Sequence, residues 1–264
     1  MDIPTAEIVC LGNELLIGVT TNTNAVFLGE HLTKLGYEVR RVTCIRDDLK
    51  LAAEFFLEVF DRKPDLILIS GGLGPTYDDI QLEVLSKATK LDLVENEVAL
   101  GQIKKYYDKK KNAGLTKERR KMALMPTGAE VLQNYVGGAP SCYLNFVGIE
   151  IYCLPGVPTE MKDIFIRHIL PRLNKKQNKK LYEKKFQIFQ SIESQLAPFI
   201  LEIKNKHSDL YVKSHPAYKD KQGIIIHISG LGDEAESEVD KAVEELQNLL
   251  RKNISDIKME PFVD

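Results

Sequence analysis

Residues 70–79, which read Ser-Gly-Gly-Leu-Gly-Pro-Thr-Tyr-Asp-Asp, combine the residue types that phosphate chemistry uses. Glycines permit positive φ and a close approach of the backbone, so successive amides can turn toward an anion. A helix is expected directly after the loop, and its N-terminus would add partial positive charge. The pattern predicts a phosphate site. The loop residues expected to bind the ligand are Ser70, Gly71, Gly72, Gly74, Pro75 and Thr76.

Asp78 and Asp79 follow the glycines within the same loop. A carboxylate beside a phosphate repels it unless a cation lies between them, so the doublet predicts a bound divalent metal, with Mg²⁺ as the expected ion. The alternative is that one of the two aspartates caps the helix that follows. Neither Gly-x-Gly-x-x-Gly nor Gly-Lys-Ser/Thr occurs here, which argues against Rossmann and Walker phosphate sites.

Residues 12–24 form a second polar loop, after the first expected strand. Its glycines, amides, hydroxyls and one carboxylate, Glu14, suit the edge of a heterocycle or a phosphate. The alternative is a capping loop, in which Thr23 or Asn24 caps a helix that begins at Ala25. Glu14 has no capping role there. The ligand-binding residues expected in this loop are Gly12, Asn13, Asn22 and Asn24.

Two shorter features lie at expected strand-to-helix connections. Asp47 and Asp48 precede a helix that either of them can cap, and Asp47 is the further candidate acid. A turn at residues 155–160 either aims a helix N-terminus at the same crevice or is a plain connection; its expected ligand-binding residues are Pro155, Gly156, Pro158 and Glu160. No Ser/His/Asp or Cys/His arrangement is legible, so covalent catalysis is not expected.

Hydrophobic spacing predicts the elements that position these loops. Apolar runs predict strands at residues 6–11, 37–45 and 66–69, and three-to-four spacing predicts helices at 25–35, 51–60 and 80–89. This alternation is typical of a doubly wound α/β sheet, which binds ligands beyond the carboxyl ends of its parallel strands. Charged helical surface is expected at 95–121, strands at 130–132, 141–146 and 150–154, and a helix at 159–169 with Thr159 as its N-cap and Pro171 just past its end.

A lysine-rich stretch at residues 174–180 is expected to be a linker, or else a basic patch. Beyond it, strands at 185–190, 209–214 and 223–229 and helices at 193–204 and 234–252 predict a compact βαββα unit. The domains expected are therefore 1–178 and 179–264.

The composition is that of an ordinary folded chain of 264 residues, with 44% hydrophobic residues and a formal net charge of −2. A nearly neutral chain gives no whole-molecule field for nucleic acid, and the absence of a long apolar run argues against a membrane span, so a small-molecule partner and a cytoplasmic location are expected. The four cysteines are scattered without a Cys-x-x-Cys pair, which predicts buried reduced thiols and no structural zinc.

Taken together, residues 4–172 resemble the MoaB/Mog family of molybdopterin-binding domains, and in particular its CinA-like (competence/damage-inducible) branch. The motifs that carry the resemblance are Gly12-Asn13-Glu14-Leu15-Leu16-x-Gly18, Asn22-Thr23-Asn24, Gly71-Gly72-Leu73-Gly74-Pro75-Thr76 with Asp78-Asp79, Gly138-Ala139-Pro140 and Leu154-Pro155-Gly156-x-Pro158-x-Glu160-Met161. Ser70, Gln81 and Ser141-Cys142 depart from the usual pattern. The region after residue 180 does not resemble the amidohydrolase domain of bacterial CinA, so deamidation is not expected.

The resemblance implies a three-layer α/β/α domain with a mostly parallel sheet, to which the small C-terminal βαββα unit is added. It also implies a homo-oligomer, a dimer or a trimer, that binds molybdopterin or an adenylated nucleotide. The two functional aspartates of Mog-type members correspond by motif to Asp47 and Asp79. CinA-like members are linked instead to metal-dependent hydrolysis of nucleotide diphosphates such as ADP-ribose or FAD.

Two functions are therefore expected. The first is a metal-dependent nucleotide pyrophosphatase in which Asp78 and Asp79 hold the metal and Glu14 or Asp47 orders the attacking water. The alternative is a molybdopterin-binding protein of molybdenum cofactor biosynthesis without hydrolytic activity.

Overall fold

The computed structural model describes residues 3–109, 114–175, 181–216 and 223–262. The chain divides into two compact units, Met1–Lys176 and Gln177–Asp264. The domain boundary expected after residue 178, and most of the expected linker, fall at 176–180, outside the described residues, and stay predictions.

A six-stranded sheet of order β2-β1-β3-β8-β7-β6 forms the centre of the first unit. Strand β1 pairs in parallel with β2 and β3, and β3 pairs in parallel with β8, whereas β7 is antiparallel to both β8 and β6. The expected mostly parallel α/β sheet is confirmed. Its strands are β1 (Thr5–Leu11), β2 (Glu38–Ile45), β3 (Leu66–Ser70), β6 (Glu130–Leu132), β7 (Ser141–Phe146) and β8 (Ile149–Leu154).

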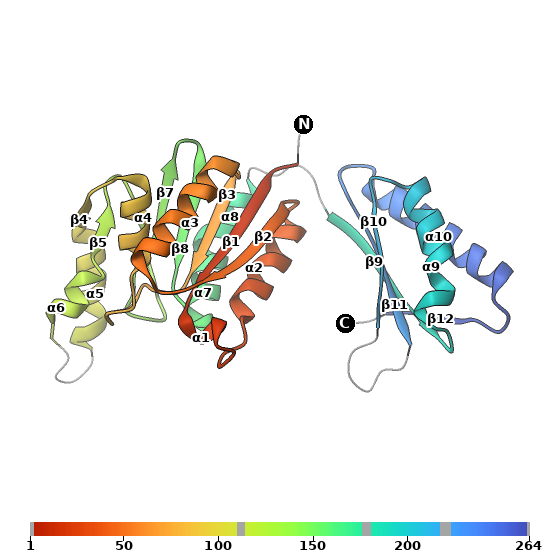
Figure 1. Cartoon of the computed structure of the whole chain (residues 1–264), viewed down its shortest axis with the longest axis horizontal. Helices are drawn as coiled ribbons and strands as arrows, with labels where there is room; N and C mark the ends of the chain where they lie inside the picture. Colours follow the sequence, from red (N-terminus) through yellow and green to blue (C-terminus); the bar gives the residue numbers. More distant parts are fainter. Residues whose placement is uncertain (1–2, 110–113, 176–180, 217–222, 263–264) are drawn as a thin grey trace. The chain divides into compact units, whose positions relative to one another are not determined.

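Helices cover both faces of this sheet, which gives the three layers visible in Figure 1. Ile67 and Ile69 of β3 pack against the helices on one face, and Leu66 and Leu68 pack against those on the other, which explains the uninterrupted apolar run. One layer contains α3 (Leu49–Arg62), α4 (Gln81–Thr89) and α5 (Glu97–Asp108). The other contains α2 (Thr23–Lys34), α7 (Pro158–Ile164), the π-helical turn η1 (Phe165–Ile169) and α8 (Leu170–Asn174).

The carboxyl ends of β1, β3 and β8 bring three loops to one edge of the sheet, because these strands are parallel neighbours. Backbone hydrogen bonds tie the loops to adjacent strands: Gly12 N–H donates to Ile45 O (3.2 Å), and Gly71 N–H donates to Leu154 O (3.1 Å). A short helix that we did not predict, α1 (Asn13–Leu16), begins the first loop.

Helix starts differ from several expectations. Asn22, rather than Thr23 or Asn24, caps α2 by accepting the N–H of Ala25 (3.0 Å). Asp48 caps α3 by accepting the N–H groups of two residues in its first turn, and this leaves Asp47 outside the helix. Helix α4 has Ile80 at its N-cap and no side-chain cap, so the alternative in which Asp78 or Asp79 caps this helix is wrong.

The helix after β8 was also predicted with wrong ends. Val157 occupies the N-cap without a side-chain hydrogen bond, so Thr159 is not the cap. Pro171 does not end the helix either, because η1 intervenes and Pro171 falls in the first turn of α8, where a missing N–H breaks no helical hydrogen bond.

The region expected to be charged helical surface, residues 95–121, contains α5 and α6 (Lys117–Lys121); residues 110–113 lie outside the described part of the chain. Two short strands that we did not predict, β4 (Leu93–Glu95) and β5 (Leu124–Pro126), pair beside it as a small antiparallel sheet.

The second unit is an antiparallel sheet of order β10-β11-β9-β12 with two helices. The βαββα pattern is confirmed, and an additional strand, β12, pairs with β9 after it. Ile188, Ile226 and Leu246 are fully buried between the sheet and the helices. The elements are β9 (Leu181–Phe189), α9 (Glu193–Lys206), β10 (Tyr211–Pro216), β11 (Ile224–Leu231), α10 (Ala235–Asn253) and β12 (Lys258–Pro261).

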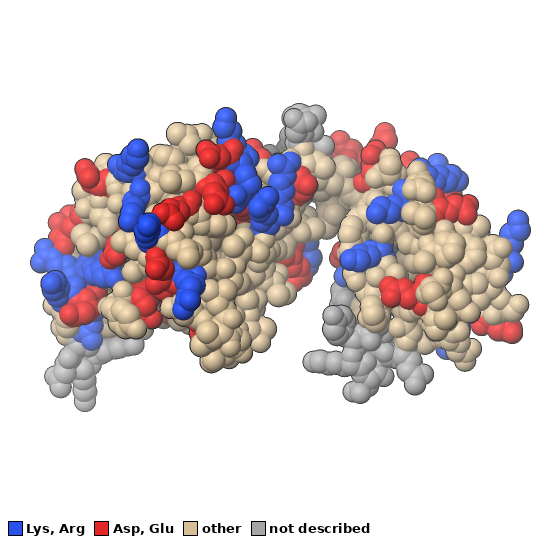
Figure 2. All heavy atoms as spheres, viewed as in Figure 1, with Lys and Arg blue, Asp and Glu red and all other residues tan. Residues whose placement is uncertain are grey.

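Basic and acidic side chains are interspersed on the face of each unit that Figure 2 shows, as the small net charge leads one to expect. Of the helices that the structure describes, none has the length and apolarity that crossing a bilayer demands. All four cysteines are free thiols; Cys44 is half-buried and the other three are buried.

Candidate functional site

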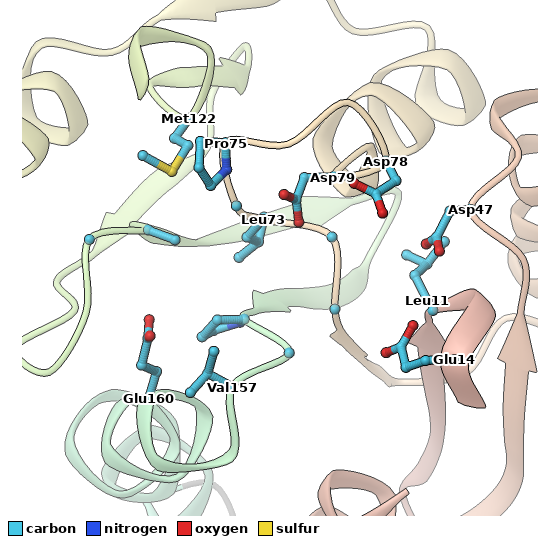
Figure 3. A pocket seen from close by; sticks show the side chains of 18 of the residues that line it. Leu11, Glu14, Asp47, Leu73, Pro75, Asp78, Asp79, Met122, Val157 and Glu160 are labelled. Atoms are coloured by element: carbon cyan, nitrogen blue, oxygen red, sulfur yellow. The ribbon is translucent and has the colours of Figure 1, made fainter. Parts of the chain in front are cut away.

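A cavity of about 460 Å³ opens where the three loops meet (Figure 3). Most of the residues proposed from the sequence line it: Gly12, Glu14, Asp47, Gly71, Gly72, Gly74, Pro75, Asp78, Asp79, Pro155, Gly156 and Glu160. The remaining lining residues are Leu11, Leu73, Tyr106, Tyr107, Met122, Gly138, Ala139 and Val157.

The glycine loop after β3 has the conformation that an anion site needs. Gly71 and Gly72 have φ of 103° and 78°, and a Cβ on Gly71 would lie 2.1 Å from the carbonyl oxygen of Leu11. Gly71 N–H is already bonded to β8, but the N–H groups of Gly72, Leu73 and Gly74 donate no hydrogen bond to any described residue. Three consecutive amides at the wall of the cavity therefore have no partner in the described part of the chain.

Gln81 anchors this loop through hydrogen bonds to its backbone. It is buried, its N–H donates to Gly72 O (3.0 Å), and its side-chain amide donates to Gly71 O and to Leu154 O (3.2 Å). The departure from the family pattern at this position thus has a structural role, because the amide spans the ends of two strands.

Four carboxylates gather on one side of the cavity: Glu14, Asp47, Asp78 and Asp79 (Figure 3). Partial burial raises the pKa of Asp47, and the negative charges of Glu14, Asp78 and Asp79 raise it further, while a hydrogen bond from Asn13 N–H (2.8 Å) acts in the opposite direction. The like-charge effect shows that Asp47 is electrostatically coupled to the other three acids. We call these four residues the acidic end of the cavity.

Thr76 holds the aspartate doublet together. Its N–H donates to Asp79 Oδ2 (2.8 Å), and its hydroxyl lies within hydrogen-bonding distance of both Asp78 and Asp79. A hydroxyl has one proton, so it can donate to only one of the two carboxylates at a time. The other carboxylate can then bind water or a cation.

Among the described residues, no lysine, arginine or histidine lines the cavity to neutralise these acids. Nor do the described residues contain a group of three or more His, Cys, Asp and Glu side chains arranged to hold a metal ion. Asp78 and Asp79 fit a more open mode of binding, in which Mg²⁺ takes one or two carboxylates, water and the phosphate oxygens of a ligand.

The other predicted residues support the loops from outside this cavity. Asn24 Nδ2 donates to Ser70 Oγ (2.9 Å) and to Gly156 O (2.8 Å), so it joins α2 to two of the loops. Asn13 and Thr76 contact the acids through the hydrogen bonds given above. A neighbouring cavity of about 80 Å³, which shares Glu14, Gly71 and Gly156 with the first, is lined by Asn22, Asn24, Ser70 and Pro158.

Sequence reasoning missed one wall of the cavity. Tyr106 and Tyr107 come from α5, which we interpreted as charged surface, and they lie at Gly138, where a Cβ would be 2.8 Å from the first ring and 3.1 Å from the second. Arg119 packs over the Tyr107 ring at 4.1 Å. The motif Gly138-Ala139-Pro140 was the only sequence signal for this wall, and it named no aromatic partner.

A buried residue, Asn134, was also missed. It is 4% exposed, and its side-chain amide donates to Glu160 Oε2 (2.6 Å) and Ala139 O (2.9 Å). Its Oδ1 accepts the N–H groups of Val136 (3.0 Å) and Gly137 (2.7 Å). Asn134 therefore fixes both the loop that contains Gly138 and the position of Glu160.

Comparison with known proteins gives consistent matches. Residues 7–175 match the model of a family described as "Probable molybdopterin binding domain". A protein of Saccharolobus islandicus (strain L.S.2.15 / Lassen #1) is 41% identical over 250 residues, which cover 95% of this chain and 94% of that protein. A protein of Sulfurisphaera tokodaii is 39% identical over 254 residues, covering 94% and 96% of the two chains.

Among solved structures, the chain is similar to a crystal structure titled as the protein CinA with unknown function from Thermoplasma acidophilum. The identity is 40% and the TM-score 0.59, and the match covers 64% of this chain and 98% of that one.

Proposed function

We propose a function for this chain from its family, since it belongs to the MoaB/Mog family of molybdopterin-binding domains, within its CinA-like group. The proposed function is that of a metal-dependent hydrolase that splits a phosphoanhydride in a nucleotide or pterin nucleotide.

One observation carries the proposal: four carboxylates line the same cavity as a glycine loop. Three N–H groups of that loop donate no hydrogen bond to a described residue, and none of the described residues that line the cavity is basic. A binding site for a phosphate alone is better served by Arg or Lys. Acids beside an anion-binding loop make physical sense where a divalent cation joins the two.

Asp78 and Asp79 are the residues that would hold this cation, since Thr76 keeps both carboxylates at one point of the loop. When bound, Mg²⁺ would neutralise charge on the phosphate oxygens and make the phosphorus easier to attack.

Asp47 is the better candidate for the general base. A carboxylate with a raised pKa accepts a proton more readily than an ordinary one, and the hydrogen bond from Asn13 N–H occupies only one of its oxygens, Oδ2. Glu14, which lies over Gly12 beside it, would help to orient the water.

In the proposed reaction a water oxygen bonds to phosphorus and the anhydride P–O bond breaks. Asp47 takes the proton of the water, and the leaving phosphate takes the electron pair of the broken bond. The N–H groups of Gly72, Leu73 and Gly74 would stabilise the charge that develops on the transferred phosphoryl group, a type of contribution worth roughly 10²- to 10³-fold in rate per donor.

Turnover of ADP-ribose, FAD and an adenylated pterin, each with and without Mg²⁺, tests the proposal. We expect metal-dependent hydrolysis of at least one of them. Asp79→Asn should abolish that turnover, whereas Asp61→Asn, a change on α3 outside the cavity, should leave it intact. Unchanged turnover in Asp79→Asn would refute the assignment.

The family description favours a second candidate, a protein that binds molybdopterin without chemistry. It predicts tight binding that a chelator does not weaken, and no hydrolysis of any of the three substrates. Calorimetry with and without EDTA separates the two candidates, because the hydrolase needs the metal to accept the phosphate. The expected homo-oligomer and the cytoplasmic location stay predictions under either function.

A further inference from the structure

At the end of the cavity opposite the acidic end, the described residues contribute a single carboxylate, that of Glu160 on α7 (Figure 3). Glu160 lies across the cavity from the other four acids (Figure 3). A metal shared with Asp78 and Asp79 therefore does not explain it.

The direction of this carboxylate is fixed by its surroundings. Asn134 donates to Oε2, and the orientation of the Asn134 amide is itself set by the two backbone N–H groups that its oxygen accepts. Gly137 leaves the necessary room, since a Cβ there would lie 2.0 Å from Oε2. Glu160 Oε1 has no hydrogen-bond partner among the described residues.

A favourable interaction with the helix dipole is the simpler explanation for an acid in the first turn of a helix. It does not account for this side chain, which makes its hydrogen bond to Asn134, 26 positions earlier in the chain, and none to the N–H groups of its own helix. The carboxylate is held toward the cavity instead.

Beside Glu160 lies an aromatic wall. Gly137 contacts the carboxylate and the next residue, Gly138, contacts the rings of Tyr106 and Tyr107. A flat ring that stacks on this wall would present its edge to Glu160. Aromatic stacking of this kind is worth about 1–3 kcal/mol for a base.

The chemistry of a carboxylate restricts which ring edge fits. An ionised carboxylate only accepts hydrogen bonds, so it matches an edge with two adjacent donors and is repelled by a ring nitrogen that is itself an acceptor. A 2-amino-4-oxo ring has such a pair, the amino group and the neighbouring ring N–H. Adenine places an acceptor nitrogen next to its amino group.

We propose that Glu160 is the specificity-determining residue of the cavity and selects a ligand with a 2-amino-4-oxo ring edge, as in guanine and pterins, over adenine. Asn134 is the residue that positions it. The inference rests on the proposed function in one respect, that the phosphate of the ligand lies at the acidic end. This inference also predicts the order of substrate preference, in which a guanine or pterin nucleotide comes before ADP-ribose.

Calorimetry on the full chain with Mg²⁺ and four ligands tests this: GMP, IMP, AMP and 6-hydroxymethylpterin phosphate. IMP keeps the ring N–H of GMP but lacks the 2-amino group. We expect GMP to bind at least roughly tenfold more tightly than AMP, with IMP between them. The pterin phosphate distinguishes a pterin from a guanine as the ring that the cavity prefers. Whichever of the pterin phosphate and GMP binds more tightly identifies the preferred class of ligand.

Glu160→Gln is the matched variant. The oxygen of the glutamine amide can still accept the hydrogen bond from Asn134, but its nitrogen then donates into the cavity. Because a donor no longer matches the two donors of the guanine edge, the preference for GMP over AMP should vanish or reverse. Asp163→Asn, a change on the same helix at a residue that pairs with Arg167 outside the cavity, should keep the preference. Thermal unfolding and binding of Mg²⁺-pyrophosphate check that Glu160→Gln is folded with an intact acidic end.

AMP binding as tightly as GMP to the wild type, or a preference that survives in Glu160→Gln, would overturn the inference. So would a large loss of affinity for 2′-deoxy-GMP together with equal binding of GMP and AMP, because Glu160 would then bind the ribose. None of these monophosphates contains an anhydride. Ring preference without hydrolysis of any diphosphate would therefore sink the proposed function alone, and hydrolysis without ring preference would sink this inference alone.

Discussion

The two ends of the cavity place carboxylates in the same local setting, over a glycine that has no side chain to collide with them. A Cβ on Gly74 would lie 2.5 Å from Asp79 Oδ2, and a Cβ on Gly137 would lie 2.0 Å from Glu160 Oε2. The two carboxylates differ in the groups that surround them. Asp79 shares Thr76 with Asp78 and acts on the charge of Asp47, whereas Glu160 has an amide donor and two tyrosine rings nearby. The same group is thus suited to a cation at one end and to a hydrogen-bonding ring edge at the other.

Filling the space over one glycine should have the largest effect. Gly74→Ala should push the Asp79 carboxylate from its place and lower turnover about 10²-fold, since a displacement of about 1 Å at a reacting centre has effects of that size. Initial rates at saturating Mg²⁺ measure the effect. Gly137→Ala is the control at the other end, and it should change the GMP-to-AMP preference while metal-dependent turnover persists. Equal effects of both changes on turnover would contradict the distinction.

Removal of the amide that holds Glu160 should have the next largest effect. In Asn134→Ala the preference for GMP over AMP should fall by roughly tenfold, because an untethered carboxylate no longer meets the ring edge in one orientation. The unfolding temperature should also fall, as two backbone N–H groups lose their acceptor. Calorimetry with Mg²⁺-pyrophosphate shows whether the acidic end survives, and an unchanged GMP preference would argue against the positioning role.

Metal binding should distinguish the two ends in the absence of any nucleotide. Mg²⁺ at ten times its dissociation constant should stabilise the wild type by about 1.4 kcal/mol, because it binds only the folded acidic end. Glu160→Gln should keep this stabilisation, and Asp79→Asn should lose most of it. Thermal unfolding with increasing Mg²⁺ measures both variants. If Mg²⁺ failed to stabilise only Glu160→Gln, the metal would bind at the Glu160 end, contrary to the proposal.

The smallest expected effect concerns the repulsion within the acidic end. The folded-state pKa of Asp47 is raised, so the folded protein binds this proton more tightly than the unfolded chain, and stability declines as pH rises through the carboxyl range. Asp47→Asn cannot ionise. It should therefore raise the unfolding temperature by about 1–3 °C at pH 7 without metal, and leave it unchanged near pH 3.

Asp48→Ala is the control for this change at the neighbouring residue. It should lower the unfolding temperature, since it removes the cap of α3, and leave turnover as in the wild type. An unfolding temperature of Asp47→Asn below that of the wild type at pH 7 would contradict the repulsion argued here.

Much of the fold could be predicted from the sequence because its signals are local. The apolar run of β3 and the helical spacing of Ala52, Phe56 and Val59 on α3 report burial directly, and these elements are found where they were expected. The errors occur where local signals are equivalent. Asn22, Thr23 and Asn24 are all plausible caps, and only the approach of other strands makes Asn22 the cap and turns Asn24 toward Gly156.

The candidate site likewise contains residues that the sequence could predict and residues that it could not. The glycines and the aspartate doublet are contiguous in sequence, so their chemistry could be read from it. Tyr106 and Tyr107 could not be assigned, because a tyrosine on a charged helix is ordinarily surface and becomes a cavity wall only when Gly138 is folded against it. Asn134 lacked a signal altogether, since its partners are mostly backbone atoms of one loop.

Local sequence was enough to specify the parallel sheet, the glycine loop at the end of β3 and the acids beside it, because each follows from interactions between residues that are neighbours in the chain. Only long-range packing settled which acids gather at one end of the cavity and which lies at the other. That choice depends on contacts across large separations, such as 34 positions between Asn13 and Asp47 and 132 between Asn24 and Gly156. Distances of this kind are set by the packing of the whole domain, on which no local pattern reports.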